Sequence, residues 1–312
     1  MKIPVTGGEI KLQEIGFTLV HEHLKTESEA VKIQWPHIYS EELAFKNAVE
    51  EVKRAKSLGV STICDASVMG LGRDVRFIER VAKEAKINVV VATGVYLRSE
   101  LPFYFLGRNE EEIAELFVHD IKNGIQGTQT KAAFLKVTTD PSLTQDVELA
   151  LKAVAIAHEK TKAPIYTHTN AHMKTGLEQQ RIFKEMGVDL ARVCIGHTGD
   201  TTDMDYIKKI LGEGSFVGLD RYGLDYLLPV EERNKVLQDL IKDGFADQIL
   251  VSQDYCCSID WGIAKPENKP LLAPRWSMTL VFEEVIPLLR KISDELVEKI
   301  FVENPQRFLG KI

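Results

Sequence analysis

The sequence is poor in cysteine and has no long apolar run, and these two absences narrow the class of protein. Its 312 residues include only four cysteines, and Cys256 and Cys257 are adjacent, so they cannot pair without strain. We therefore expect four reduced thiols and no disulfide framework. Residues 1–14 lack the apolar core of a signal peptide, and no apolar stretch approaches the length of a bilayer span. These features predict a cytoplasmic protein that makes no membrane contact.

Basic runs and a nucleotide-binding glycine motif are also missing. The formal net charge is −7, and no lysine- and arginine-rich stretch suggests a surface for nucleic acid. The compact glycine cluster Gly70–Gly72 departs from Gly-x-Gly-x-x-Gly, so it gives little support to a dinucleotide site. With 44% hydrophobic and 27% charged residues, the composition is that of an ordinary globular protein with a large core. We therefore expect chemistry on a small molecule.

What the sequence does contain is a regular alternation of strand-like and helix-like segments. Eight short β-branched runs are predicted as strands: Phe17–Val20, Thr62–Ala66, Asn88–Gly94, Ala132–Thr138, Pro164–Thr167, Arg192–His197, Ser215–Leu219 and Ile249–Asp254. Segments between them carry apolar residues at helical spacing: Glu41–Leu58, Asp74–Lys86, Glu110–Asn123, Thr144–Lys160, Gly176–Met186, Met204–Leu211 and Glu231–Asp243. Strict alternation predicts parallel strands, and eight such units close into a (β/α)8 barrel more readily than into an open sheet.

The last part of the chain is predicted to add a long loop and two helices. Tyr255–Pro274 lacks helical periodicity, and a long loop inside a compact domain is usually functional. Helices are expected over about Trp276–Lys291 and Asp294–Val302, with Asn304-Pro305 breaking the last one. No linker or low-complexity segment divides the chain, so residues 1–312 are expected to form one domain.

Histidines occur at the ends of successive predicted strands, and the carboxyl ends of barrel strands surround one common opening. One histidine lies on each side of Glu22, and strand alternation aims both imidazoles to the same side. A single histidine is more often a packed or solvated residue than a metal ligand. The prediction of a metal site therefore rests on the occurrence of several histidines at successive strand ends. His37, His119 and His158 are interpreted as structural or solvated, and His172 as a weak candidate for a supporting role. The candidate ligands at strand ends are His21, His23, His168, His197 and Asp254.

Lys136 joins this set because it lies within the apolar strand segment Phe134–Val137. An edge strand with a solvated lysine is the simpler alternative, but a closed barrel has no edge. An inward ammonium needs a partner or a chemical change, and addition of CO2 would give a carbamate able to bridge two cations. Nitrogen and oxygen ligands suit Zn, Fe, Co or Mn without choosing among them. Two such cations would share a hydroxide, since they lower the pKa of water from ~16 toward ~7, and Asp254 could then shuttle its proton.

Several of these segments carry a resemblance to a known family. The segment Gly16–Leu24, together with Lys136, His168, Gly196–Asp200 and Asp254, resembles the phosphotriesterase family of the amidohydrolase superfamily. Val68–Asp74, Gly218–Gly223 and Asp254–Cys257 are similar to the phosphotriesterase-like lactonases, especially thermophilic archaeal members. The resemblance covers essentially the whole chain. It implies a binuclear, homodimeric (β/α)8 hydrolase with a carboxylated lysine that opens N-acyl homoserine lactones and other γ- or δ-lactones and cleaves organophosphate triesters more weakly.

The resemblance also implies roles for single residues. One cation would be held by His21, His23 and Asp254, the other by His168 and His197, and both by Lys136. Tyr96 matches the family tyrosine that contacts the reacting ester, and Arg221 matches the arginine that braces it. For these two residues the plainer alternatives are core packing and a surface salt bridge. Leu71, Tyr96, Arg221, Cys256 and Trp261 are the expected substrate-binding residues, and the segment from Cys256 to Trp261 would line an acyl-chain channel.

Three functions stay open at this point. The first is a lactonase with promiscuous triesterase activity, and the second is a dedicated aryldialkylphosphatase on the same site. The third is a barrel with structural cations that serves binding or assembly, although the presence of both Asp254 and Lys136 argues against it. The first two differ mainly in the loop after the eighth strand. A long loop with Trp261 suits an aliphatic acyl chain, whereas a compact aromatic pocket would suit a triester.

Overall fold

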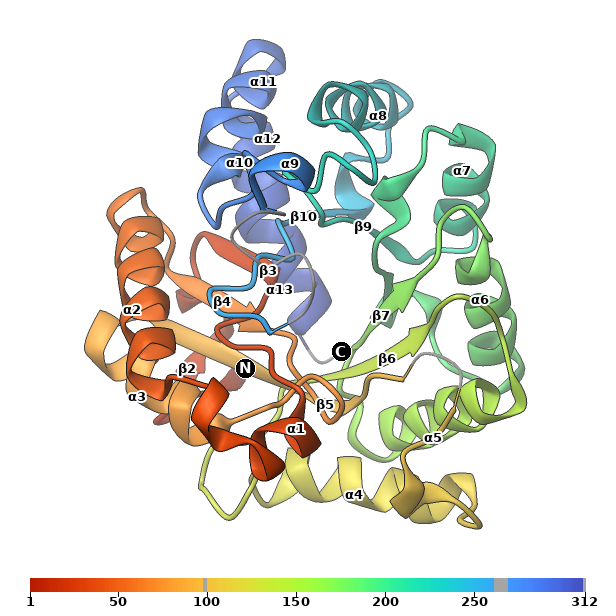
Figure 1. Cartoon of the computed structure of the whole chain (residues 1–312). Coiled ribbons are helices and arrows are strands. Elements are labelled where there is room, and N and C mark those ends of the chain that lie inside the picture. Colours follow the sequence, from red (N-terminus) through yellow and green to blue (C-terminus); the bar gives the residue numbers. More distant parts are fainter. Residues whose placement is uncertain (98–99, 261–268, 311–312) are drawn as a thin grey trace.

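The computed structural model describes residues 1–97, 100–260 and 269–310. Its centre is a sheet of eight parallel strands, and helices surround these strands (Figure 1). Each strand pairs with the next one in sequence. The strands are β3 Thr18–Glu22, β4 Thr62–Asp65, β5 Asn88–Val95, β6 Phe134–Thr139, β7 Ile165–Thr169, β8 Val193–Ile195, β9 Phe216–Leu219 and β10 Ile249–Val251. The prediction of a (β/α)8 barrel is confirmed, and all eight predicted strands are present.

The surrounding helices begin where the sequence provides capping side chains. Ser40, Asp74 and Thr144 each accept a hydrogen bond from the backbone amide three residues later, which satisfies a free donor of the first turn. The main connecting helices are α2 Glu41–Ser57, α3 Val75–Ala85, α4 Glu110–Lys122, α5 Gln145–Thr161, α6 Thr175–Glu185, α7 Met204–Gly212 and α8 Val230–Lys242. A shorter helix, α1 Glu29–Gln34, precedes them. Among the helices of the described residues, none has both the length and the apolar character needed to cross a membrane.

Each strand contributes an inward side chain to the interior of the barrel. These side chains form one buried cluster: Val20, Cys64, Val90, Phe134, Tyr166, Cys194, Phe216 and Leu250. The alternate side chains of the strands pack in a second cluster with the helices. All four cysteines are free thiols, as expected. The barrel is therefore filled by side chains below the level of its carboxyl end, where the polar residues of the site begin.

The two ends of the sheet, β3 and β10, are joined by hydrogen bonds outside the regular ladders. The amide of Asp254 donates to the His21 carbonyl over 3.0 Å, and the amide of His23 donates to the Tyr255 carbonyl over 2.9 Å. The His21 amide donates to Ser252 Oγ over 3.1 Å. These contacts close the barrel at the seam between β3 and β10, and three of the candidate ligands, His21, His23 and Asp254, lie on that seam.

A short antiparallel hairpin precedes the barrel and was missed by the sequence analysis. Its strands are β1 Lys2–Val5 and β2 Gly8–Lys11. Thr6 donates its amide to the Val89 carbonyl, and Ile3 and Val5 belong to the same buried cluster as the barrel interior. The hairpin therefore covers the interior from the end opposite the candidate site.

The sequence predictions for the C-terminal part were partly wrong. The expected helix Trp276–Lys291 begins only at Leu280 and is interrupted at Glu284. Pro305 does not break a helix, because it lies in the first turn of α13, where a missing amide hydrogen costs little. The expected loop Tyr255–Pro274 also contains a short helix. The observed elements are α9 Lys269–Leu272, α10 Leu280–Glu283, α11 Val285–Ile292, α12 Glu295–Glu298, a π-helical turn Lys299–Glu303 and α13 Asn304–Leu309, drawn in blue in Figure 1.

Candidate metal centre and substrate pocket

The first two candidate ligands depend on an irregularity in β3. Val20 fills the barrel interior while Leu19 packs with the helices, so simple alternation would point His21 outward. The register between β3 and β4 shifts between Leu19 and Glu22, and such irregularities re-aim side chains. As a result His21 and His23 line the same pocket at the carboxyl end of the barrel. The prediction that these two imidazoles lie on one side was therefore right, but strand alternation alone does not bring them there.

These two histidines approach a carboxylate and a lysine. His23 Nε2 lies 3.1 Å from Asp254 Oδ1, and His21 Nε2 lies 3.3 Å from the same oxygen. Lys136 Nζ lies 2.9 Å from His21 Nε2. Lys136 comes from β6 and Asp254 from the segment after β10, so side chains far apart in the sequence meet at one point.

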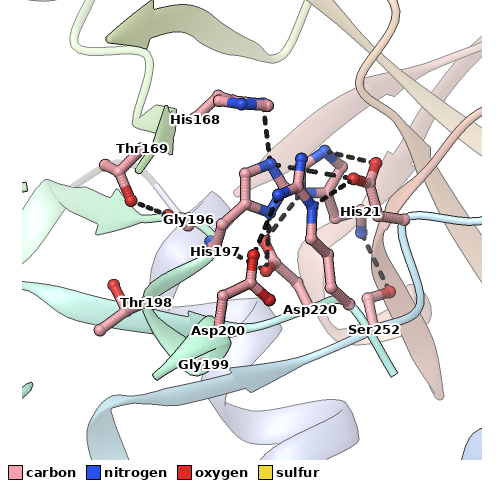
Figure 2. A network of polar contacts seen from close by, with 12 residues as sticks. His21, His168, Thr169, Gly196, His197, Thr198, Gly199, Asp200, Asp220 and Ser252 are labelled. Atoms are coloured by element: carbon pink, nitrogen blue, oxygen red, sulfur yellow. Dashed lines mark hydrogen bonds and ion pairs between the residues drawn. The ribbon is translucent and has the colours of Figure 1, made fainter. Parts of the chain in front are cut away.

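A second pair of histidines adjoins the first group. His197 Nε2 lies 2.9 Å from His168 Nδ1 (Figure 2). The same nitrogen lies 3.8 Å from Asp254 Oδ2. His197 lies two residues after β8 and has a left-handed backbone with φ +59°. All six residues predicted as ligands therefore converge, with their inner nitrogen and oxygen atoms directed toward one another.

The outer nitrogens of three of these rings are held by hydrogen-bond partners. Asp220 accepts from His21 Nδ1 over 2.8 Å and from His197 Nδ1 over 3.0 Å (Figure 2). His23 Nδ1 lies 2.8 Å from Ser67 Oγ. Such partners fix the orientation of a metal-binding imidazole and leave its other nitrogen free to coordinate. Sequence reasoning missed Asp220, although its position directly after β9 was an available signal.

Burial keeps the imidazoles of His21, His168 and His197 uncharged. It lowers the pKa of His21 to about 4 and that of His168 to about 3, so both rings are neutral near pH 7. Burial also lowers the pKa of Lys136 to about 8. Among the described residues, no carboxylate lies within ion-pair distance of Lys136 Nζ. An inward lysine without a neutralising partner is the feature that the sequence analysis anticipated.

The donor set fits divalent cations. His21, His23 and Asp254 offer ligand atoms that all lie within 4.8 Å of one another. A second group of His21, His197 and Asp220 meets the same criterion, but Asp220 faces the outer nitrogens of both rings. We therefore interpret Asp220 as a support for the ligands. Neutral imidazoles combined with a carboxylate suit Zn and neighbouring transition metals.

Asp254 is also held from its other side by a chain of buried charges. Arg221 Nε donates to Asp254 Oδ2 over 2.9 Å, and Arg221 Nη1 donates to Asp200 Oδ2 over 2.9 Å. Arg233 Nη1 lies 2.7 Å from Asp200 Oδ1. Only 16% of the Arg221 side chain is exposed, so the simpler alternative of a surface salt bridge does not describe it.

The pocket next to these residues has a mixed polar and apolar wall and a volume of about 100 Å³. Tyr96 packs edge-on against the His168 ring, with centroids 5.2 Å apart. Four of the five expected substrate-binding residues line the pocket, whereas Trp261 lies outside the described residues. Ile259, from the segment predicted to line an acyl-chain channel, also lines the pocket, and so do four residues that were not predicted: Thr26, Leu224, Tyr226 and Trp276.

The other four histidines lie away from this pocket. His158 is buried and donates Nδ1–H to the Ala163 carbonyl, while His37, His119 and His172 are exposed. None of the four lines the pocket, so nothing supports a role for His172 in it.

The fold and the site together define a (β/α)8 barrel with a histidine-rich cluster at the carboxyl ends of its strands. The chain matches the model of the phosphotriesterase family over residues 1–309, and it belongs to this family. It is 58% identical to the aryldialkylphosphatase of Saccharolobus solfataricus over 99% of this chain and 100% of that protein. It is 41% identical to a phosphotriesterase homology protein of Mycobacterium tuberculosis over 97% and 96% of the two chains.

A solved structure agrees with these relatives. The phosphotriesterase from Mycobacterium tuberculosis matches with a TM-score of 0.95 at 38% identity, covering 100% of this chain and 99% of that one. The resemblance inferred from the motifs is confirmed, and so is the prediction of a hydrolase that acts on esters.

Proposed function

We propose that this protein is a binuclear metal-dependent lactonase that also cleaves organophosphate triesters more slowly. The observation that carries the proposal is the convergence of six potential ligands beside a pocket with a mixed polar and apolar wall. The pocket volume of about 100 Å³ fits a small lactone ring or a phosphoryl group, with the rest of the substrate extending outward. Leu71, Ile259 and Leu224 offer apolar contacts to an aliphatic chain.

Two cations would be shared among these ligands. His21, His23 and Asp254 would hold one, His168 and His197 the other, and a carboxylated Lys136 both. When bound, divalent cations lower the pKa of a shared water toward ~7 and polarise the carbonyl or phosphoryl oxygen under attack. The ligand types suit Zn, Fe, Co or Mn.

Lys136 is suited to carboxylation because burial lowers its pKa to about 8, which leaves part of the amine neutral near pH 7. The neutral Nζ adds to CO2 and releases one proton, giving an anionic carbamate. Lys136→Ala should lose bound metal and most activity, with partial rescue of both by short carboxylic acids. Lys25→Ala is the control, since Lys25 is also buried but pairs with Asp74, and carboxylic acids should not rescue it. Full activity and metal content in Lys136→Ala would contradict the carbamate.

The remaining residues would handle protons and orientation. Asp254 would accept a proton from the attacking water and pass it to the leaving alkoxide. Arg221 holds the other oxygen of that carboxylate at 2.9 Å and so keeps it directed at the site. The hydroxyl of Tyr96 would donate to the oxyanion that develops during attack.

The alternative is a dedicated phosphotriesterase, which the name of the 58% identical relative favours. The deciding measurement compares kcat/KM for acyl homoserine lactones, simple δ-lactones and a paraoxon-type triester on one preparation of known metal content. We expect at least one lactone to exceed the triester by about tenfold or more. Triester turnover well above that of every lactone would establish the alternative, and absence of turnover on all of them would overturn both.

We also propose a homodimer. In support, α1 and the turn after it expose three large apolar side chains: Ile33, Trp35 and Ile38 are 75%, 55% and 62% exposed. Burial of such a patch between two copies would remove apolar surface from water. Light scattering should give twice the chain mass of 35.1 kDa, and Trp35→Glu should shift the mass toward that of one chain. A monomeric wild-type protein would contradict this proposal.

A further inference from the structure

Glu22, the last residue of β3, lies between His21 and His23 and has no role in the chemistry proposed above. Its side chain is completely buried, yet it does not line the pocket. Its carboxylate lies at the seam of the barrel, against the segment that follows β10. The side chains of His21 and His23 face the pocket, whereas the side chain of Glu22 faces the backbone of the segment after β10.

The carboxylate of Glu22 binds on both sides of Asp254. Oε1 accepts from the Gln253 amide over 3.0 Å and from Ser252 Oγ over 2.7 Å. Oε2 accepts from the Tyr255 amide over 2.7 Å. Among the ion pairs of the described residues, none involves Glu22. Its hydrogen-bonding capacity is therefore directed to the backbone that carries Asp254.

The backbone of Asp254 needs such support. Its φ is +51°, in the left-handed region that a residue with a side chain rarely adopts. Conformations of this kind persist where surrounding contacts determine them, and they are frequent at functional sites. The amide of Asp254 donates to the His21 carbonyl, while Glu22 binds the amides before and after it. The three consecutive amides of residues 253–255 are thus fixed by His21 and Glu22.

We propose that Glu22 is a positioning residue that holds Asp254 in the left-handed conformation needed to bind metal. This inference rests on the proposed function, because it assumes that Asp254 is a ligand. Loss of the carboxylate would let the peptide at Asp254 relax and would move its oxygens away from His21 and His23. The binding of a cation by those three residues would become weaker, although Glu22 does not contact the cation.

The test uses Glu22→Gln, which keeps the shape of the side chain but turns an amide group toward at least one backbone donor. Co²⁺ is titrated into the metal-free protein, and its visible absorption reports both affinity and ligand geometry. We expect the dissociation constant of one Co²⁺ equivalent to rise about tenfold or more and its spectrum to change. Ser252→Ala, which removes one of the three hydrogen bonds to Glu22 and the acceptor of the His21 amide, should shift the affinity in the same direction by a smaller factor.

Two comparisons separate positioning from general stability. Asn304 braces the other end of β10, with Nδ2 2.8 Å from the Ala246 and Ile249 carbonyls. Asn304→Ala should lower Tm while leaving the Co²⁺ affinity and spectrum unchanged. In the Asp254→Asn background, Glu22→Gln should have no further effect on Co²⁺ binding.

An unchanged spectrum and affinity in folded Glu22→Gln would overturn the inference, as would equal effects in both backgrounds. Failure of the proposed function would look different, because wild-type protein would then bind fewer than two equivalents or hydrolyse no lactone or triester.

Discussion

At the scale of single residues, Asp220 supports two of the candidate ligands at once. It binds His21 and His197, which belong to different proposed cation sites, and it also accepts from the Tyr166 hydroxyl over 2.6 Å. A single carboxylate therefore sets the orientation of two imidazoles. The two sites cannot be tuned independently as long as they share this support.

Replacing Asp220 with Asn should weaken both cation sites together. An amide cannot accept from both Nδ1 atoms in the same way, so each ring gains rotational freedom, and loss of such supports typically costs 10–100-fold in metal affinity. Competition with a chromogenic chelator would measure both equivalents. Tyr166→Phe is the matched control, since it removes one bond to Asp220 and leaves both rings held. Weakening of only one equivalent in Asp220→Asn would contradict the shared role.

His158 should make folding sensitive to acid at a distance from the candidate metal centre. Burial lowers its pKa, so the folded protein keeps the ring neutral, whereas the unfolded chain takes up a proton near pH 6.5. The free energy of unfolding should therefore fall as the pH drops below about 6.5. His158→Gln should reduce this loss when urea midpoints are compared at pH 7.5 and 5.5. His119→Gln should not change it, because the His119 side chain is 64% exposed.

At the scale of elements, the segment after β10 forms an extension of the barrel seam. The Cys257 amide donates to the His23 carbonyl, and the Thr26 amide donates to the Ser258 carbonyl. Asp260 then accepts from the Ser28 amide over 2.7 Å and from the Tyr39 hydroxyl over 2.6 Å. This part of the long loop is therefore fixed to the segment after β3.

Asp260→Asn should loosen the apolar wall of the pocket. The exposed hydrogen bonds of Asp260 are each worth about 1 kcal/mol, so their loss should release Cys256 and Ile259 only in part. We expect KM for a long-chain acyl lactone to rise about threefold, while kcat for a small δ-lactone stays unchanged. Tyr39→Phe should give a smaller effect of the same kind. A change in kcat for the small lactone would show that the metal centre itself had moved.

The sequence predicted the elements better than it predicted their ends. Periodicity located every barrel strand, because the inward and outward faces pack against different partners. It could not reveal the register shift at Leu19 to Glu22, since that shift depends on pairing with β4. The sequence pattern also did not predict that the helix continues through Pro305. This continuation depends on the π-helical turn Lys299–Glu303, for which the sequence has no local signal.

At the scale of the whole molecule, the six candidate ligands come from strands distributed around the barrel. Bound cations would therefore link the first strand to the last and stabilise the closed form. At metal concentrations about 1,000 times Kd, binding contributes about 4 kcal/mol. Dialysis against a chelator should lower Tm by roughly 10 °C, and adding back Zn²⁺ or Co²⁺ should restore it. The Asp254→Asn variant should lose less on dialysis, whereas an unchanged Tm in the wild type would mean that no stabilising ion is bound.

Closure of the seam between β3 and β10 also has a consequence for biosynthesis. His21 and Asp254 are separated by most of the chain, which at 5–20 residues per second corresponds to roughly ten seconds to a minute of translation. During that interval a nascent chain presents His21 and His23 without their carboxylate partner. A cation bound at that stage would have two imidazole ligands and would lack the remaining ligands. A cation that binds would therefore be held by the full set of ligands only after the barrel has closed.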